Sequence, residues 1–345
     1  MDHWNDYLAA IINDDTAPTP HPGGPLDATR LANGFVAVVD SLGLIAVSGD
    51  DAATFLHTQL TNDVEHLGTG EARLAAYCSP KGRLQASFLT WRTADTVYLQ
   101  LARDVQPALQ KRLSMFVMRA KAKLAYASEG MVTLGLGGAG AEAALQRITG
   151  LMPGGPYGKV DTDAGTVIRV ADAFDFPRFL WITSEAQARS AIDALRAELT
   201  LGGDQAWSLS SIHAGVPLIT HATVDQFVPQ MVNFELLGGV NFKKGCYPGQ
   251  EIVARSQYLG KLKRRTALAT IAAAAKAGDE VFAEDDPGQP CGMIVNAAEN
   301  GAGGTDVLVE LKLAVLGGSA VHLGAVNGAA LSFLTMPYPL DAIEV

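Results

Sequence analysis

The pattern of apolar residues changes near residues 262 to 266, and this change constrains the fold more than any other feature of the chain. Before it, strand-like alternation and helix-like spacing are mixed, as in an α+β protein. A chain of 345 residues is long enough for two or three domains of ordinary size. Beyond it, short apolar runs separated by turns are typical of a small antiparallel barrel, and they occupy residues 267–271, 280–282, 293–295, 307–311 and 331–334.

The first part of the chain divides further. Residues 13–34 are rich in Pro, Gly, Asp and Thr and lack periodicity, which predicts an extended segment. Residues 35–39 and 44–47 predict two short strands that could pair as a hairpin. Residues 131–200 predict a small α+β unit, whose last helix begins with Ser184 and Gln187 in capping-box spacing.

Four segments are therefore expected. They are an extended N-terminal segment over residues 1–34, an α+β domain over residues 35–130 plus 201–262, a small α+β domain over residues 131–200, and an antiparallel barrel over residues 263–345.

Composition limits the compartment and the chemistry. The N-terminal sequence MDHWND is acidic where a signal peptide is basic, and no apolar run approaches the roughly 18 residues that span a bilayer, so we expect a cytoplasmic protein with no membrane partner. The three cysteines, Cys78, Cys246 and Cys291, form no CxxC pair, which predicts reduced thiols and no metal site. Core or edge packing is the expected role of Cys78 and Cys291.

Charge is unevenly distributed. The net charge of −10 argues against indiscriminate nucleic-acid binding, yet residues 243–265 carry seven basic side chains and one acid, Glu251, and would suit an anionic partner. Direct tRNA contact through Arg119, Lys121, Lys123 and the 261–265 cluster would make binding steeply salt-dependent. Solvated faces fit the overall negative charge better.

The densest local signal reads KKGCYPGQEIVAR and spans residues 243–255. Its glycines and proline place Cys246 in a tight loop rather than inside a helix or a strand. A helix is expected over residues 250–258, and its N-terminal amides, together with Lys243 and Lys244, would favour a thiolate that reacts or binds metal. The residues alone leave two interpretations open: a reactive Cys246, or a small buried residue where two elements approach closely.

This segment resembles a known family. KGCYPGQE at residues 244–251 matches the signature KGCYxGQE of the YgfZ family of folate-binding, tRNA-modification-related proteins, which are relatives of the glycine-cleavage aminomethyltransferase. Residues 49–64, 78–83 and 227–242 agree with the family in the same order, so the resemblance covers about residues 35–340.

The resemblance implies a three-domain, aminomethyltransferase-like α+β fold, in which a ring of domains surrounds a central channel and the C-terminal domain is a small β-barrel. The channel would hold tetrahydrofolate or a related reduced folate, whose flat pterin and anionic tail require an aromatic face, polar partners and cations. Trp207 is at a position similar to the family's pterin-contacting tryptophan, with a core anchor as the alternative. Leu42 stands at the other family tryptophan position and removes one stacking face.

Further site residues follow from the same resemblance. Glu251 would pair with the amino and ring N–H groups of the pterin, while Arg255 or Lys244 would meet the tail. A solvated helix face is the alternative for Glu251 and Arg255. The expected folate-binding set is completed by Tyr247 and Gln250.

Three polar residues between Trp207 and the signature, His213, His221 and Asp225, could form a cluster. Because they lack metal-ligand spacing, an ordinary loop role is favoured.

The expected function is not aminomethyl transfer. In the relatives, an acid after the Gly-rich turn positions the folate nitrogen, whereas here residues 82–87 read GRLQAS and contain no carboxylate for that proton-transfer role. The resemblance instead implies a folate-binding accessory protein in iron-sulfur cluster assembly or repair, with iron-sulfur assembly proteins or client enzymes as partners, an indirect effect on tRNA modification and Cys246 as the functional thiol. The alternative is a folate-dependent one-carbon transferase or demethylase of unknown substrate.

Overall fold

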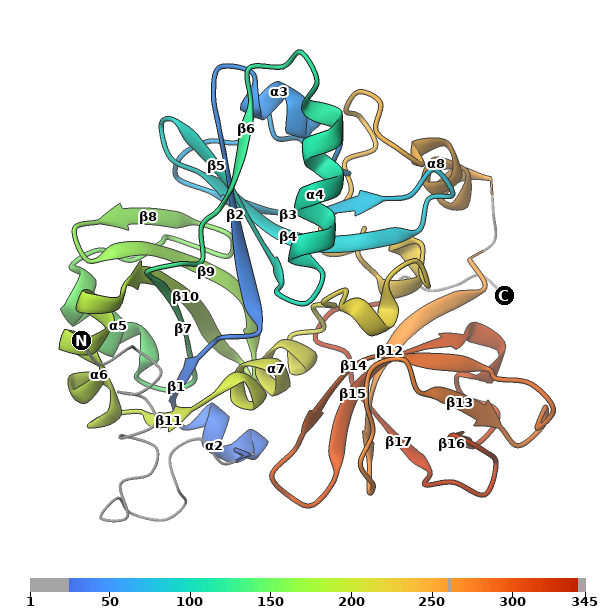
Figure 1. The fold of residues 1–345 in the computed structure, drawn as a ribbon. Coiled ribbons are helices and arrows are strands. Elements are labelled where there is room, and N and C mark those ends of the chain that lie inside the picture. Colours follow the sequence, from blue (N-terminus) through green and yellow to red (C-terminus); the bar gives the residue numbers. More distant parts are fainter. Residues whose placement is uncertain (1–24, 260–261, 341–345) are drawn as a thin grey trace.

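A computed structural model of the chain describes residues 25–259 and 262–340. Three sheets surround a common centre (Figure 1). Each packs its own cluster of buried apolar side chains. Of the extended segment expected over residues 1–34, the first 24 residues lie outside the described part. Residues 28–32 are helical instead, as α2 (Ala28–Ala32), because the carboxylate of Asp27 accepts a hydrogen bond from the Arg30 N–H at 2.8 Å and caps the first turn.

The first sheet follows the order β3-β4-β5-β2-β6 and is antiparallel throughout. Apolar residues on its inner face pack with two helices, so this unit has a core of its own. Its elements are β2 (Leu42–Ser48), α3 (Ala52–His57), β3 (Ala72–Cys78), β4 (Leu84–Arg92), β5 (Thr96–Ala102), α4 (Gln106–Val117) and β6 (Lys123–Tyr126).

The second sheet follows the order β11-β1-β7-β10-β9-β8. The hairpin expected between residues 35–39 and 44–47 is wrong, since β1 pairs with β7 and β11 of this sheet whereas β2 pairs with β5 and β6 of the first. The Ser184 cap is confirmed, because its Oγ accepts from the Gln187 N–H. The elements are β1 (Phe35–Val38), β7 (Met131–Gly137), α5 (Ala141–Thr149), β8 (Lys159–Thr162), β9 (Gly165–Ala173), β10 (Phe176–Ser184), α6 (Glu185–Arg196) and β11 (Thr200–Gly202).

The third sheet is the expected C-terminal barrel. It follows the order β16-β13-β14-β15-β12-β17 and curls so far that its two edge strands meet, through a bridge between His322 and Ala330. Closure of this kind covers edge strands that would otherwise be open to pairing. The elements are β12 (Arg264–Ile271), β13 (Glu280–Ala283), β14 (Gly292–Glu299), β15 (Thr305–Lys312), η3 (Leu313–Val315), β16 (Val321–Leu323) and β17 (Leu331–Leu334).

Helix α7 (Asp204–His213) lies where the three units meet (Figure 1). Trp207 on this helix packs against β7 of the second sheet, and Nε2 of His213 lies 2.6 Å from a carboxylate oxygen of Asp306 on β15 of the barrel. The chain then passes through the short 3-10 turns η1 (His221–Thr223) and η2 (Pro229–Val232) to reach α8 (Gln250–Tyr258) and the barrel.

Candidate functional site

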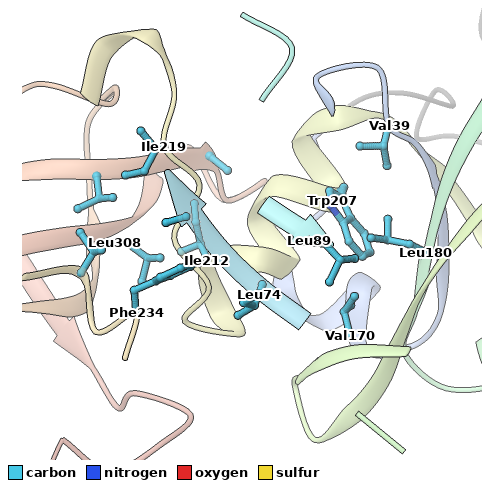
Figure 2. Packing of buried hydrophobic residues seen from close by; sticks show 14 of the residues in the cluster. Val39, Leu74, Leu89, Val170, Leu180, Trp207, Ile212, Ile219, Phe234 and Leu308 are labelled. Atoms are coloured by element: carbon cyan, nitrogen blue, oxygen red, sulfur yellow. The ribbon is translucent and has the colours of Figure 1, made fainter. Parts of the chain in front are cut away.

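A cavity of about 560 Å³ lies between the three units. Most of its surface is apolar, and all three units contribute to it: Leu42 and Leu89 from the first sheet, Leu180 from the second and Asn296 from the barrel. Trp207 lines it from α7, and Figure 2 shows this side chain close to Leu89, Leu180 and Val170. The volume lies within the range of roughly 300–1,000 Å³ that small-molecule sites occupy.

The indole of Trp207 is held between two neighbours. A Cβ atom added at Gly135 would lie 2.2 Å from Cε3 of the ring, so only glycine fits beneath it. The guanidinium carbon of Arg178 lies 4.8 Å from the ring centroid, a cation–π contact. Trp207 is therefore fixed by packing and borders the cavity beside Arg178, which lines the cavity as well.

Arg178 is a buried cation on the cavity wall. Its Nε donates to the carbonyl of Ala171 at 2.8 Å, and its Nη1 donates to the hydroxyls of Ser210 and Ser211 at 2.8 and 3.1 Å. Burial lowers the pKa of Arg178 to about 10, although Tyr157 and Asp172 act in the opposite direction. The side chain stays charged at neutral pH.

A second, polar cleft of about 480 Å³ adjoins the cavity. Leu74 and Tyr157 line both spaces, so the two are separated by these side chains. The cleft also contains Asn62, Asp63 and Asn241. The three units therefore enclose an apolar chamber that has a polar cleft as its neighbour.

The cysteine loop begins at the rim of this polar cleft. The side-chain oxygen of Asn241 accepts from the Lys243 N–H at 2.9 Å, and the Asn241 N–H donates to the carbonyl of Thr61. Cys246 is exposed with a free thiol. Sequence analysis placed Cys246 in a tight loop ahead of a helix over residues 250–258, and the structure confirms both features.

Lys244 anchors the loop to the end of α3. Its ammonium donates to the main-chain carbonyls of His57 and Leu60, which have no helical partner beyond the last turn. Burial lowers the pKa of Lys244 to about 8, while Asp63, Cys246 and Glu65 act to raise it. The ammonium also lies 4.8 Å from the centroid of the Tyr247 ring, whose hydroxyl is buried without a hydrogen-bond partner among the described residues.

Histidine and aspartate side chains lie beside the same loop. Nδ1 of His57 is 3.0 Å from Oδ1 of Asp63, and Nδ1 of His66 is 2.8 Å from Oδ2 of the same carboxylate. Burial alone would raise the pKa of Asp63, but the hydrogen bonds from His66 and the charge of His57 lower it. A Cβ atom added at Gly245 would lie 3.8 Å from Nε2 of His57, so this imidazole faces the loop next to Cys246.

Two of the family-like motifs of the sequence are in contact through glycines. A Cβ atom at Gly249 would lie 2.7 Å from Cα of Gly82, and one at Gly82 would lie 2.9 Å from Cβ of Ile252 on α8. Both glycines have positive φ, 78° and 70°. The turn at residues 78–83 and the signature at residues 244–251 therefore pack backbone against backbone, which places the start of α8.

The other family-like segments meet here as well. The side-chain amide of Asn62 donates to the carbonyls of Leu74 and Gly238, both at 2.7 Å, which joins residues 49–64 to residues 227–242. Gln230 donates to the carbonyl of Val253 on α8 at 2.9 Å. The three other segments that carry the resemblance thus support the segment that contains the cysteine loop.

The predicted folate-binding residues fall into two groups. Trp207 lines the cavity, as does Leu42 at the second tryptophan position. The remaining members lie elsewhere: Lys244 and Tyr247 anchor the loop, and Gln250, Glu251 and Arg255 lie on α8, where Glu251 and Arg255 are exposed. The arrangement does not bring Glu251 or Arg255 to the cavity that Trp207 lines, so the expectation that they share one ligand with Trp207 does not fit it.

Sequence reasoning missed Arg178, Tyr157 and the pair of His57 with Asp63. The signal for Arg178 was available, since it is the one charged residue in the otherwise apolar strand FPRFLWITS. Its burial and its contact with Trp207 depend on pairing across the second sheet, which no local pattern reveals. Cys78 and Cys291 are buried, as expected.

Two absences concern only residues 25–259 and 262–340. Within this part of the chain, no helix is long and apolar enough to cross a membrane. The same residues contain no cluster of three or more His, Cys, Asp or Glu side chains that could hold a metal ion.

Comparison with solved structures shows the fold. The chain superimposes on the glycine cleavage system aminomethyltransferase T from Bartonella henselae with a TM-score of 0.73 and 18% sequence identity, over 89% of this chain and 87% of that one. The aminomethyltransferase-like α+β fold expected from the sequence is confirmed. The GCVT N-terminal domain family matches residues 27–162.

Curated relatives show the family. The tRNA-modifying protein YgfZ of Klebsiella pneumoniae is 34% identical over 75% of this chain and 79% of its own length. The proteins of the same name from Shigella sonnei and Escherichia coli O157:H7 are also 34% identical, over 71% and 73% of this chain and 74% and 76% of their own lengths. Because the sequence similarity extends over about three quarters of the chain, and because the fold and the motifs around the cysteine loop agree with it, the chain belongs to the YgfZ family.

Proposed function

We propose that this protein is a folate-binding accessory protein in iron-sulfur cluster assembly or repair, that it supports tRNA modification indirectly, and that Cys246 is its functional thiol. One observation carries the proposal. The loop of the exposed Cys246 begins at Asn241, on the rim of a cleft that shares Leu74 and Tyr157 with the Trp207 cavity. An exposed thiol on a loop beside the cleft, with a ligand chamber next to that cleft, suits a protein that uses both.

The residues of the cavity fit a reduced folate. The chamber has the volume of a small-molecule site, an indole and several aliphatic walls for flat rings, and polar groups in Arg178, Gln100 and Ser211. A bound reduced folate would supply a ring nitrogen that carries one-carbon units. The protein would orient it and shield it from water.

The wall of the cavity favours an accessory role over one-carbon transfer. In the segment where the transferases carry an acid, Ser87 and Phe88 line the cavity, and the Ser87 hydroxyl accepts from the Ile219 N–H at 3.0 Å. Asp104 is the acid among the lining residues, but it is exposed and accepts from the His221 N–H. A positioned proton donor for a leaving amine needs a carboxyl group within reach of the buried ring.

The test is calorimetric titration of tetrahydrofolate into the wild type, Cys246→Ala and Trp207→Ala, together with the activity of an iron-sulfur enzyme in cells that carry each variant. Cys246→Ala should keep the wild-type Kd and lose the cellular activity, because the thiol lies outside the cavity. Trp207→Ala should lose both. Wild-type protein that fails to bind tetrahydrofolate would contradict the proposal.

The same material separates the alternatives. Turnover of methylene-tetrahydrofolate with an amine or thiol acceptor would identify a one-carbon transferase instead. Direct tRNA binding would show an affinity that falls steeply with salt and with Lys121→Ala or Lys123→Ala. The proposal expects neither.

A further inference from the structure

Arg178 on β10 differs from the buried Arg265 on β12 in having no acidic partner within the described part of the chain. Arg265 is 6% exposed and forms an ion pair with Glu235, and Arg264 pairs with Glu310. Arg178 is 2% exposed, yet among the described residues no carboxylate lies within ion-pair distance of it. Asp172, the carboxylate whose charge acts on Arg178, is hydrogen-bonded to Arg169 at 3.1 Å. The charge of Arg178 is thus buried without a counter-ion.

Burying a guanidinium without a counter-ion costs free energy, unless hydrogen-bond acceptors replace the water that it loses. The hydrogen bonds that Arg178 donates within the protein, through Nε and Nη1, all go to neutral oxygens of Ala171, Ser210 and Ser211. Neutral acceptors offset the desolvation of a guanidinium only in part. Among the described residues, hydrogen bonds are made by Nε and Nη1 and none is made by Nη2, and Arg178 lines the cavity. A donor pair is therefore left for a ligand.

The surroundings of Arg178 restrict what that ligand can be. The guanidinium lies 4.8 Å from the centroid of Trp207, in an otherwise apolar wall that includes Val170 and Leu180. Flat apolar surface beside a single strong donor suits a planar heteroaromatic ring with an oxygen acceptor at its edge. Arginine pairs in this way with the oxygen and adjacent nitrogen of a fused bicyclic base.

We propose that Arg178 recognises the ring of the cavity's ligand, by donating from Nη2 to an oxygen at the edge of a bicyclic heteroaromatic ring. This inference rests on the proposed function: with a reduced folate bound, the acceptor is the 4-oxo oxygen of the pterin. Arg178 is then a specificity-determining residue, and the opposite end of the ligand, with its carboxylates, points away from it.

The experiment uses two halves of the ligand as separate probes. 6-Methyltetrahydropterin contains the ring and no carboxylate, whereas p-aminobenzoylglutamate contains the carboxylates and no pterin. Each is titrated into the full-length wild type, Arg178→Gln, Arg178→Lys and Ser211→Ala. Loss of one charge-assisted hydrogen bond should weaken binding of 6-methyltetrahydropterin to Arg178→Gln about tenfold or more, and leave p-aminobenzoylglutamate unchanged. Arg178→Lys should lie between the two, and Ser211→Ala, which removes one of the two hydroxyl groups that hold Arg178, should weaken binding of this probe by less than Arg178→Gln does.

A spectroscopic signature separates recognition from a structural role. A cation at the 4-oxo oxygen favours loss of the N3 proton of oxidised 6-methylpterin, so the bound pterin should deprotonate at lower pH than the free one. Its ultraviolet absorption reports the change, and Arg178→Gln should abolish the difference. A purely structural tie between β9, β10 and α7 would not alter the titration of the ligand.

The outcomes are distinct. Equal affinity of wild type and Arg178→Gln for the pterin probe, or loss of the p-aminobenzoylglutamate probe alone, would overturn this inference while tetrahydrofolate binding stands. Unchanged binding of p-aminobenzoylglutamate also shows that Arg178→Gln is folded. Failure of the wild type to bind tetrahydrofolate would instead contradict the proposed function.

Discussion

At the scale of single residues, Lys244 both anchors the cysteine loop to the end of α3 and places a charge near Cys246. Its ammonium satisfies two carbonyls at the end of α3 and lies near Cys246, while burial lowers its pKa to about 8. Below that pH the side chain is charged and favours an anionic sulfur nearby; above it, the charge is lost. The reactivity of Cys246 should therefore depend on Lys244 most at neutral and mildly acidic pH.

Lys244→Met should slow alkylation of Cys246 by iodoacetamide below pH about 8 by up to about fivefold, the equivalent of about 1 kcal/mol between unit charges in water. Above that pH the two rates should converge. Mass spectrometry gives the rates, since Cys78 and Cys291 are buried. Lys243→Met removes the same charge from an exposed neighbour and is the matched control. A rate ratio for Lys244→Met that does not change with pH would count against the interpretation.

Gly135 is the second residue with a measurable consequence. Because a Cβ atom there would lie 2.2 Å from the Trp207 ring, Gly135→Ala should push the indole toward Arg178 and the cavity. We expect a loss of about 1–3 kcal/mol in the free energy of unfolding and weaker tetrahydrofolate binding. Gly154→Ala, at a glycine with open space around it and no positive φ, controls for the substitution itself. Unchanged tryptophan fluorescence and affinity in Gly135→Ala would argue against a packed indole.

At the scale of elements, α7 connects the barrel to the rest through His213 and Asp306. Burial would raise the pKa of Asp306, but hydrogen bonds from His213, Asn300 and Thr270 lower it below the ordinary value of 3.8. A lowered carboxyl pKa contributes stability above the unfolded value and loses it as pH falls through the folded value. The contact between His213 and Asp306 should thus stabilise the packing of the barrel on α7 at neutral pH, and this stabilisation should be lost in acid.

His213→Ala should lower the free energy of unfolding by about 1–3 kcal/mol at neutral pH, because it leaves the partly buried carboxylate of Asp306 short of a partner. The difference from the wild type should shrink as pH falls below 3.8. His66→Ala is the control, since its ring also contacts an aspartate but is 79% exposed, so it should cost about 1 kcal/mol or less. Urea titrations across pH measure both, and equal losses in the two variants would contradict the assignment.

Elements whose ends are determined by neighbouring residues could be predicted from the sequence, whereas strand pairings between distant segments could not. The helix after Ser184 and the one after Gly249 follow from caps and turn residues within a few positions of their starts. The pairing partner of β1 does not follow from nearby residues, because the turn after β1 is equally compatible with a hairpin. The strand that pairs with β1 is β7, nearly a hundred residues away. The same limit applies to the site. The Cys246 loop was readable from its glycines, whereas the position of Arg178 beside Trp207 depends on sheet register.

At the scale of the whole molecule, the cavity is bordered by all three sheets, so a ligand that fills it contacts every unit at once. Binding to the folded state alone stabilises it by about 2.7 kcal/mol when the ligand is at 100 times its Kd. Tetrahydrofolate at that concentration should raise the Tm of the wild type by roughly 4 °C, as one transition. Scanning calorimetry tests this, with Trp207→Ala as the control that should not shift. A shift confined to part of a split transition would show that the ligand holds only one unit.

The separation of the apolar chamber from the polar cleft by Leu74 and Tyr157 has a kinetic consequence. Because the chamber beside Trp207 and the cleft beside the cysteine loop are separate spaces with these two side chains between them, neither has to be emptied before the other is filled. A ligand in the chamber should therefore leave the cysteine loop open to solvent, so that the rate at which Cys246 reacts with iodoacetamide should be the same with and without saturating tetrahydrofolate.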